Sequence, residues 1–102
     1  MINFKNQNIL ITGGSRGIGK ACVELFLNAD ANVAFTYQSS KKDAEKILND
    51  YTGSSILKCY QVNFSDSNEI DKTVGSVLDD FERIDAELPG GGAGGSGGGV
   101  PA

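Results

Sequence analysis

The sequence predicts an α/β fold in which strands and helices alternate three times. Two observations support this: short runs rich in β-branched residues, and amphipathic segments that separate them, up to about residue 85. Such alternation favours parallel strands joined by right-handed crossovers, with helices on the faces of the sheet. We therefore expect a three-stranded parallel sheet of order 3-2-1, the Rossmann-like arrangement of one mononucleotide-binding half.

The first strand is predicted over residues 7–12, where Ile9, Leu10 and Ile11 form a continuous apolar run. Such a run is typical of a strand that is buried on both faces. The second and third strands are predicted over residues 32–37 and 56–62.

Helical spacing of apolar residues predicts three helices, over residues 17–28, 41–51 and about 67–81. Asp66 and Glu69 have the spacing of a capping box, which marks the start of the third helix. The expected apolar faces are Ile18, Cys22, Leu25, Phe26 and Ala29; Ala44, Ile47, Leu48 and Tyr51; and Ile70, Val74, Val77, Leu78 and Phe81.

After residue 85 the composition changes sharply. Residues 90–99 hold eight of the fourteen glycines, and such a segment buries too little apolar surface to offset its ordering entropy. We therefore predict a folded unit over residues 1–85 and a flexible tail over 86–102. Pro89 and the glycines argue against a central fourth strand. The first strand would then keep an unpaired edge, through which the chain could self-associate.

Composition narrows the possible partners. Nine basic and thirteen acidic residues give a net charge of −4, which argues against broad affinity for nucleic acid or acidic membranes. The apolar runs are too short for a membrane span or a signal peptide, so a cytoplasmic location is expected. The chain has no histidine and its two cysteines are 37 positions apart, so no metal site is predicted.

Residues 12–19, Thr-Gly-Gly-Ser-Arg-Gly-Ile-Gly, connect the first strand to the first helix. At this place in a parallel sheet, glycines allow backbone and ligand to approach closely, while free N–H groups and the helix dipole attract a diphosphate. The predicted cofactor-binding residues of this loop are Gly13, Ser15, Arg16, Gly17, Ile18 and Gly19.

This loop, followed by Lys20 and Ala21, resembles the short-chain dehydrogenase/reductase family, and within it the 3-oxoacyl-[acyl-carrier-protein] reductases of fatty acid synthesis. The similarity continues through residues 33–37, 62–66 and 82–85. The resemblance implies hydride transfer between a nicotinamide and a carbonyl carbon, with a tyrosine as proton donor and a lysine that lowers its pKa.

The catalytic Ser, Tyr and Lys of that family lie on later elements, so the resemblance implies a cofactor-binding half that is inactive alone. Tyr37 and Lys41 do satisfy Y-x-x-x-K. They are expected at the adenosine end of the cofactor, remote from the nicotinamide, so no catalytic residue is assigned.

NADP is the predicted cofactor, because the second strand ends without the acidic residue that binds the ribose of NAD. Arg16 can form paired hydrogen bonds with a 2′-phosphate. In the family an Asp after the third strand usually accepts a hydrogen bond from the adenine amine; here that residue is Asn63, whose amide oxygen can also accept. The predicted adenosine-side contacts are Tyr37, Ser39, Ser40, Asn63 and Phe64.

Two other interpretations remain open from the residues alone. One is a non-catalytic nucleotide-binding or self-associating module. The other is a methyltransferase or another Rossmann-like enzyme, although such folds commonly keep a ribose-binding acid after the second strand.

Overall fold

The computed structural model describes residues 3–15 and 17–89. The elements are β1 (Asn8–Thr12), α1 (Gly17–Asn28), β2 (Asn32–Tyr37), α2 (Lys41–Asp50), β3 (Leu57–Gln61), α3 (Ser67–Phe81) and β4 (Ala86–Pro89). The first six confirm the predicted alternation. Arg16 and the greater part of the predicted tail, residues 90–102, lie outside the described residues.

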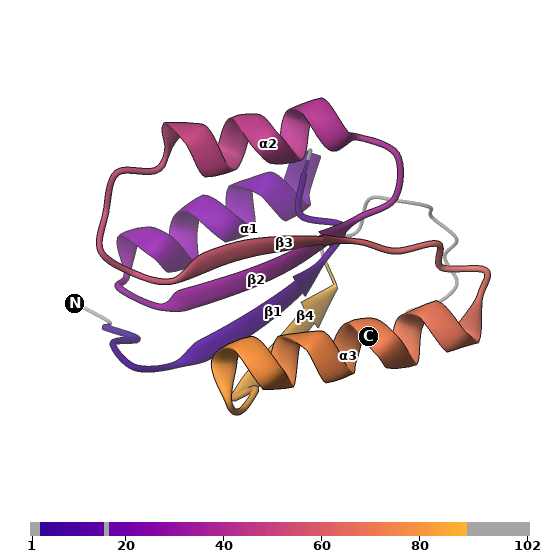
Figure 1. Cartoon of the computed structure of the whole chain (residues 1–102). Coiled ribbons are helices and arrows are strands. Elements are labelled where there is room, and N and C mark those ends of the chain that lie inside the picture. The colour runs from indigo at the N-terminus through magenta and orange to yellow at the C-terminus, as the bar shows by residue number, and fades with distance from the viewer. Residues whose placement is uncertain (1–2, 16, 90–102) are drawn as a thin grey trace.

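The molecule has three layers, with α1 and α2 on one face of the sheet and α3 on the other (Figure 1). Successive residues of a strand point to opposite faces, so β1 contributes to both layers. Ile9 and Ile11 belong to the core under α1 and α2, whereas Leu10 packs in the core under α3 with Val77 and Phe81. The prediction that the first strand is buried on both faces is confirmed.

The sheet has four parallel strands in the order β3-β2-β1-β4. The parallel Rossmann-like architecture is therefore confirmed, but the count of three strands is wrong. Ile9 to Thr12 pair with Ala86 to Pro89, so the first strand does not have the open edge that the sequence suggested as a self-association surface. The predicted boundary at residue 85 also placed β4 in the tail.

Hydrogen bonds between Asn8 and the residues after α3 explain why β4 forms. The backbone N–H of Asn8 donates to the carboxylate of Asp85 at 2.7 Å, and the N–H of Asp85 donates to the Asn8 carbonyl at 2.8 Å. These bonds set the register of the strand that follows. Pro89 is its last residue and lies on an edge strand of the described sheet, where a missing N–H is tolerated.

Asp85 should make stability depend on pH below neutrality. The N–H of Asn8, and then Arg83, hold the pKa of the Asp85 carboxyl below its ordinary value of 3.8. A lowered pKa in the folded state stabilises the fold above pH 3.8, and this contribution is lost as the pH falls through the folded-state pKa.

We therefore expect Asp85→Asn to unfold at lower urea concentration than the wild type at pH 7, with the difference shrinking below about pH 4. Urea unfolding followed by circular dichroism between pH 3 and 7 measures this. Asp43→Asn, a change on exposed α2, is the control. A wild-type advantage that stays constant down to pH 3 would contradict the role of the Asp85 charge.

The buried face of α1 differs from the predicted one. Gly19, Val23 and Leu27 face the sheet, whereas Ile18 and Leu25 are 71% and 64% exposed. Cys22 and Phe26, two members of the predicted face, are partly buried and do pack against the core. The reason for the difference is the close contact of Gly19 with the backbone of Gly13, which turns the Gly19 side of the helix toward the sheet. Periodicity did not distinguish the two faces, because apolar residues lie on both.

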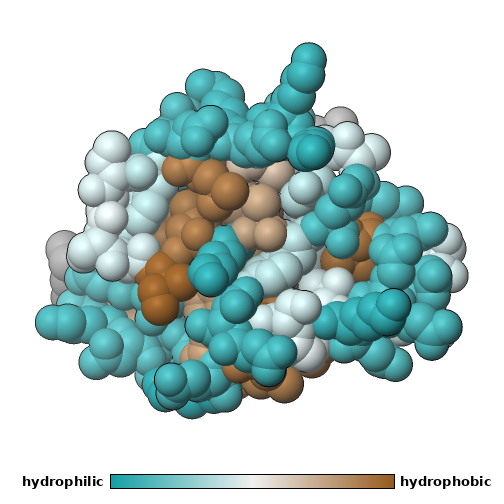
Figure 2. Space-filling view, in the orientation of Figure 1, coloured by the Kyte–Doolittle hydropathy of each residue, from teal (hydrophilic) through white to brown (hydrophobic). Residues whose placement is uncertain are grey.

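Apolar side chains also reach the surface. Figure 2 shows brown apolar surface in the band between the helices α2 and α3, which are covered mainly by teal polar side chains. The large apolar residues that are exposed in the described part are Ile18, Leu25, Ile56, Phe64, Val74 and Leu78. Among the described helices, none has the length and apolar character that a membrane crossing requires.

Candidate cofactor-binding site

The glycine-rich loop lies between β1 and α1, as the sequence predicted, and is attached to the end of β2. The backbone N–H of Gly13 donates to Oγ1 of Thr36 at 3.2 Å, and that of Gly14 donates to the Thr36 carbonyl at 2.9 Å. Gly13 has φ 73°, a left-handed conformation that glycine adopts without strain. Thr36, which the sequence analysis did not single out, therefore holds the first turn of the loop in place.

After Gly14 the loop has backbone N–H groups that can donate hydrogen bonds to an anion. No partner among residues 3–15 and 17–89 is recorded for the backbone N–H groups of Ser15, Gly17 and Ile18. They stand at the N-terminus of α1, where the helix dipole favours negative charge. Ser15 is buried and Ile18 is exposed.

The close approach of Gly19 to Gly13 defines the shape of this loop. A Cβ atom on Gly19 would overlap the carbonyl oxygen of Gly13, so only glycine allows the helix to start this close to the turn. The loop therefore has the features that suit a diphosphate. Its glycines expose the backbone, its N–H groups can donate, and it lies at the positive end of the α1 dipole.

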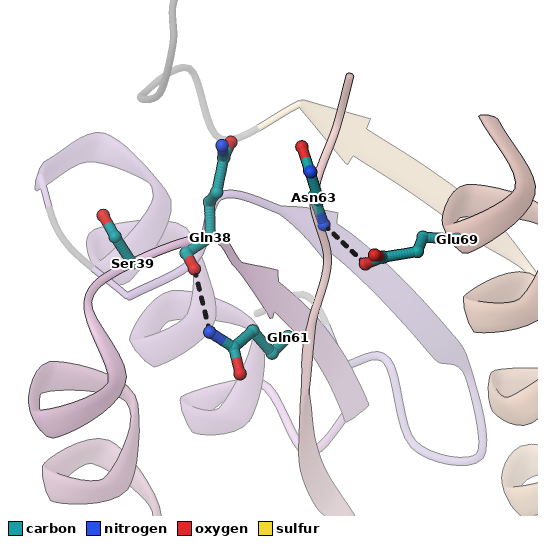
Figure 3. Close-up of a pocket in the computed structure, with 5 residues that line it drawn as sticks. All are labelled: Gln38, Ser39, Gln61, Asn63 and Glu69. Atoms are coloured by element: carbon teal, nitrogen blue, oxygen red, sulfur yellow. Dashed lines mark hydrogen bonds between the residues drawn. The ribbon is translucent and has the colours of Figure 1, made fainter. Parts of the chain in front are cut away.

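A second feature is an open pocket of about 490 Å³ at the carboxyl ends of β2 and β3. Its volume is in the range of small-ligand sites. The strands are parallel, so this pocket and the glycine-rich loop occupy the same edge of the sheet. Figure 3 shows the five residues that line it: Gln38, Ser39, Gln61, Asn63 and Glu69.

The amide of Asn63 is held by Ser65. Its Oδ1 atom accepts hydrogen bonds from the Ser65 N–H at 3.1 Å and from the Ser65 hydroxyl at 2.7 Å. A backbone N–H can only donate, so the oxygen must face Ser65 and the amide nitrogen must face away. The oxygen expected to accept a bond from a ligand is therefore already occupied, and Asn63 offers a donor instead.

Glu69 reaches from the first turn of α3 to the same segment. Its Oε1 atom accepts a hydrogen bond from the Asn63 N–H at 2.9 Å, shown as a dashed line in Figure 3. The predicted capping box is thus only half formed. The N-cap residue Asp66 accepts a hydrogen bond from the Asn68 N–H, as a cap does. Glu69, however, accepts from the N–H of Asn63 and not from the N–H of Asp66.

Tyr37 is the last residue of β2, and its side chain lies in the core between the sheet and α2. Burial, with smaller contributions from Cys59 and Glu45, raises the pKa of its hydroxyl above the ordinary value of 10.0. A catalytic tyrosine of the kind that the resemblance implies needs a lowered pKa. The raised pKa of Tyr37 does not meet that requirement. The absence of a catalytic role for Tyr37 and Lys41, and a direct contact of Tyr37 with a cofactor, both stay predictions.

The remaining predicted residues occupy the same edge of the sheet with different surroundings. Ser39 lines the pocket, and Ser40 is the N-cap of α2 but makes no side-chain capping bond. Phe64 is exposed, 36% of its surface being accessible, and does not line the pocket. Their contacts with a cofactor also stay predictions. No group of three or more potential metal ligands occurs in the described ranges.

The sequence of this chain matches a known protein family. The family model for short chain dehydrogenases matches residues 7–98. The chain belongs to the short-chain dehydrogenase family. It therefore has the fold of NAD(P)-dependent oxidoreductases, a class that uses nicotinamide cofactors.

The chain is also similar to individual proteins. NADP-dependent mannitol dehydrogenase of Hypocrea jecorina is 35% identical over 101 residues, which is 91% of this chain and 36% of that protein. The 3-oxoacyl-[acyl-carrier-protein] reductase of Staphylococcus epidermidis is 28% identical over 81 residues, covering 78% of this chain and 33% of the reductase. A short-chain dehydrogenase/reductase from Serratia marcescens superposes with a TM-score of 0.79 at 26% identity, covering 84% of this chain and 36% of that one.

The chain thus spans about a third of the length of the relatives that it matches. Four residues of the candidate site were missed by the sequence analysis: Thr36, which binds the loop, and Gln38, Gln61 and Glu69, which line the pocket. Gln38 and Gln61 had a detectable signal, since each stands at the carboxyl end of a predicted strand. Thr36 and Glu69 had been read only as strand and cap residues.

Proposed function

We propose that this chain is the NADP(H)-binding part of a short-chain dehydrogenase/reductase that interconverts a carbonyl and an alcohol by hydride transfer. The loop from Gly13 to Gly19 would bind the diphosphate, and the pocket at the ends of β2 and β3 would receive the adenosine.

The observation that carries the choice of NADP over NAD is the neutral end of β2. Gln38 and Ser39 line the pocket where a ribose-binding acid would stand. The next residue, Ser40, leaves the first turn of α2 without a side-chain cap, and Lys41 and Lys42 follow it. Neutral side chains, an uncapped helix start and two cations suit a 2′-phosphate better than a bare hydroxyl.

The proposed substrate class comes from the sequence similarities. The motif from Thr12 to Ala21 resembles 3-oxoacyl-[acyl-carrier-protein] reductases, whereas identity is higher with a protein named mannitol dehydrogenase. We favour the 3-oxoacyl thioester on the motif. We also propose that the chain by itself binds cofactor without turnover, because residues 1–102 contain no Y-x-x-x-K beyond Tyr37–Lys41. A cytoplasmic location stays part of this proposal.

Isothermal titration of the chain with NADPH and NADH tests the cofactor. We expect NADPH to bind at least tenfold more tightly. Arg16→Ala should reduce that preference by roughly ten- to a hundredfold, since hydrogen bonds to charged groups contribute about 1.5–3 kcal/mol and each 1.4 kcal/mol is a factor of ten.

Lys5→Ala removes the same charge before β1, at the other end of the sheet, and should leave the preference unchanged. Equal affinity for NADH and NADPH would contradict the choice of NADP. Tighter binding of S-adenosylmethionine than of NADPH would favour the methyltransferase alternative, and reduction of a 3-oxoacyl thioester by the purified chain would contradict the absence of turnover.

A further inference from the structure

Glu69 supplies the pocket with a positioned carboxylate. It comes from the first turn of α3, is half-buried, and lines the pocket at the end of β3. One oxygen is fixed by the N–H of Asn63 at 2.9 Å. In the part of the chain that the structure describes, no partner is recorded for its second oxygen, Oε2. This leaves a charged acceptor on a side chain that one hydrogen bond already holds in place.

Asn63, which also lines the pocket, offers a hydrogen-bond donor where Glu69 offers an acceptor. Because Ser65 occupies both lone pairs of the amide oxygen, the group that Asn63 can offer to a ligand is its amide nitrogen, which only donates. Figure 3 shows the Asn63 side chain extending to the same side of the sheet edge as that of Gln38, with Glu69 approaching from α3. The pocket wall therefore combines one carboxylate acceptor and one amide donor, from two residues that line it and are joined by the bond between the Asn63 N–H and Glu69.

This pair matches an edge of adenine. Adenine presents an exocyclic amine, which donates, next to the ring nitrogen N7, which accepts and which hypoxanthine keeps as an acceptor. We propose that Glu69 is the residue that selects adenine, its free oxygen accepting a hydrogen bond from the exocyclic amine while the Asn63 amide nitrogen donates to the neighbouring ring nitrogen. The inference rests on the proposed binding of a dinucleotide. It moves the acceptor for the amine from the residue after β3 to the first turn of α3.

The charge of Glu69 should also disfavour bases other than adenine. A carboxylate cannot donate a hydrogen bond, so a base with an oxygen in place of the amine would bring two acceptors together in the pocket. Discrimination against such a base should then be stronger than the loss of one neutral hydrogen bond would give.

The test compares NADPH with its hypoxanthine analogue, in which the exocyclic amine is replaced by oxygen, by isothermal titration of the full chain. The wild type should bind NADPH at least tenfold more tightly than the analogue. Glu69→Gln keeps a carbonyl oxygen for the Asn63 N–H but offers an NH₂ group to the base. The preference for NADPH should therefore fall at least fivefold, through weaker NADPH binding and tighter analogue binding.

Glu24→Gln, the same change on an exposed position of α1, should leave the ratio of the two affinities as it is in the wild type. A wild-type ratio near one would overturn the role of Glu69 without any variant. The role of Glu69 is also overturned if Glu69→Gln binds NADPH and has the wild-type ratio of affinities for NADPH and the analogue. In that case the proposal that the chain binds NADPH still stands. If the wild type binds no NADPH at all, the proposed function and this inference both fail.

Discussion

Gly19→Ala is expected to lower the affinity for NADPH more than tenfold. The added methyl group would overlap the Gly13 carbonyl oxygen and lie 3.0 Å from Cα of Gly14, and both are backbone atoms that no rotamer change can move. The loop and α1 must therefore separate, which displaces the donors that are proposed to bind the diphosphate. Overpacking of this kind also costs about 1–3 kcal/mol of stability. NADPH titration and urea unfolding measure the two effects.

Gly75→Ala is the matched control, because the same substitution in α3 brings the new methyl group within 4 Å of nothing. Alanine is the better residue in a helix interior, so this variant should gain about 0.5–1 kcal/mol of stability and bind NADPH as the wild type does. Wild-type affinity in Gly19→Ala would contradict the proposal that the close approach of Gly19 and Gly13 shapes the binding loop.

Asn8→Ala is expected to destabilise the fold by about 2–4 kcal/mol, since it removes several hydrogen bonds and leaves buried partners unsatisfied. The Asn8 side chain is almost completely buried. Its amide nitrogen donates to the carbonyls of Phe81 and Arg83, both at 3.0 Å, and its oxygen accepts from Asn32 at 3.0 Å. One side chain thus connects the end of α3, the entry to β4 and the start of β2. Urea unfolding at pH 7 measures the loss.

Asn49→Ala, an exposed position on α2, is the control and should change stability by less than about 0.5 kcal/mol. If Asn8→Ala unfolds at the same urea concentration as Asn49→Ala, the network around Asn8 does not hold β4 in place. Hydrogen exchange adds a local measurement: Asn8→Ala should increase exchange at Glu87 and Leu88 more than at Phe35, which is fully buried in β2.

The elements that were predicted correctly are those in which local pattern and tertiary position agree. The run Ile9-Leu10-Ile11 has no polar residue, and both faces of β1 are covered by helices. The glycines at 13, 17 and 19 follow that strand and begin a helix, which is the local arrangement that a phosphate loop requires. These parts can be predicted because the residues that determine their backbone conformation are neighbours in the sequence.

The fourth strand could not be predicted in this way. Pro89 and the following glycines are poor strand residues, and the four residues from Ala86 to Pro89 are too few for a periodic pattern to indicate a strand. The segment becomes a strand because β1 offers a backbone partner and Asp85 bonds to Asn8 across 77 positions. Pairing of this range depends on which segments meet in space, and a sequence window does not contain that information.

The amino-acid sequence by itself determined the order of the first six strands and helices, the place of the glycine-rich turn between β1 and α1, and the neutral end of β2. Only the tertiary structure decided which side of α1 is buried, how the sheet is completed, and that Asn8 connects the end of α3 to the entry of β4 and the start of β2. The physical reason is that periodicity and turn chemistry act over a few residues. A long-range hydrogen bond or a buried face depends instead on groups from other elements that meet in the folded chain. For a hydrogen bond these groups must come within about 3 Å of each other.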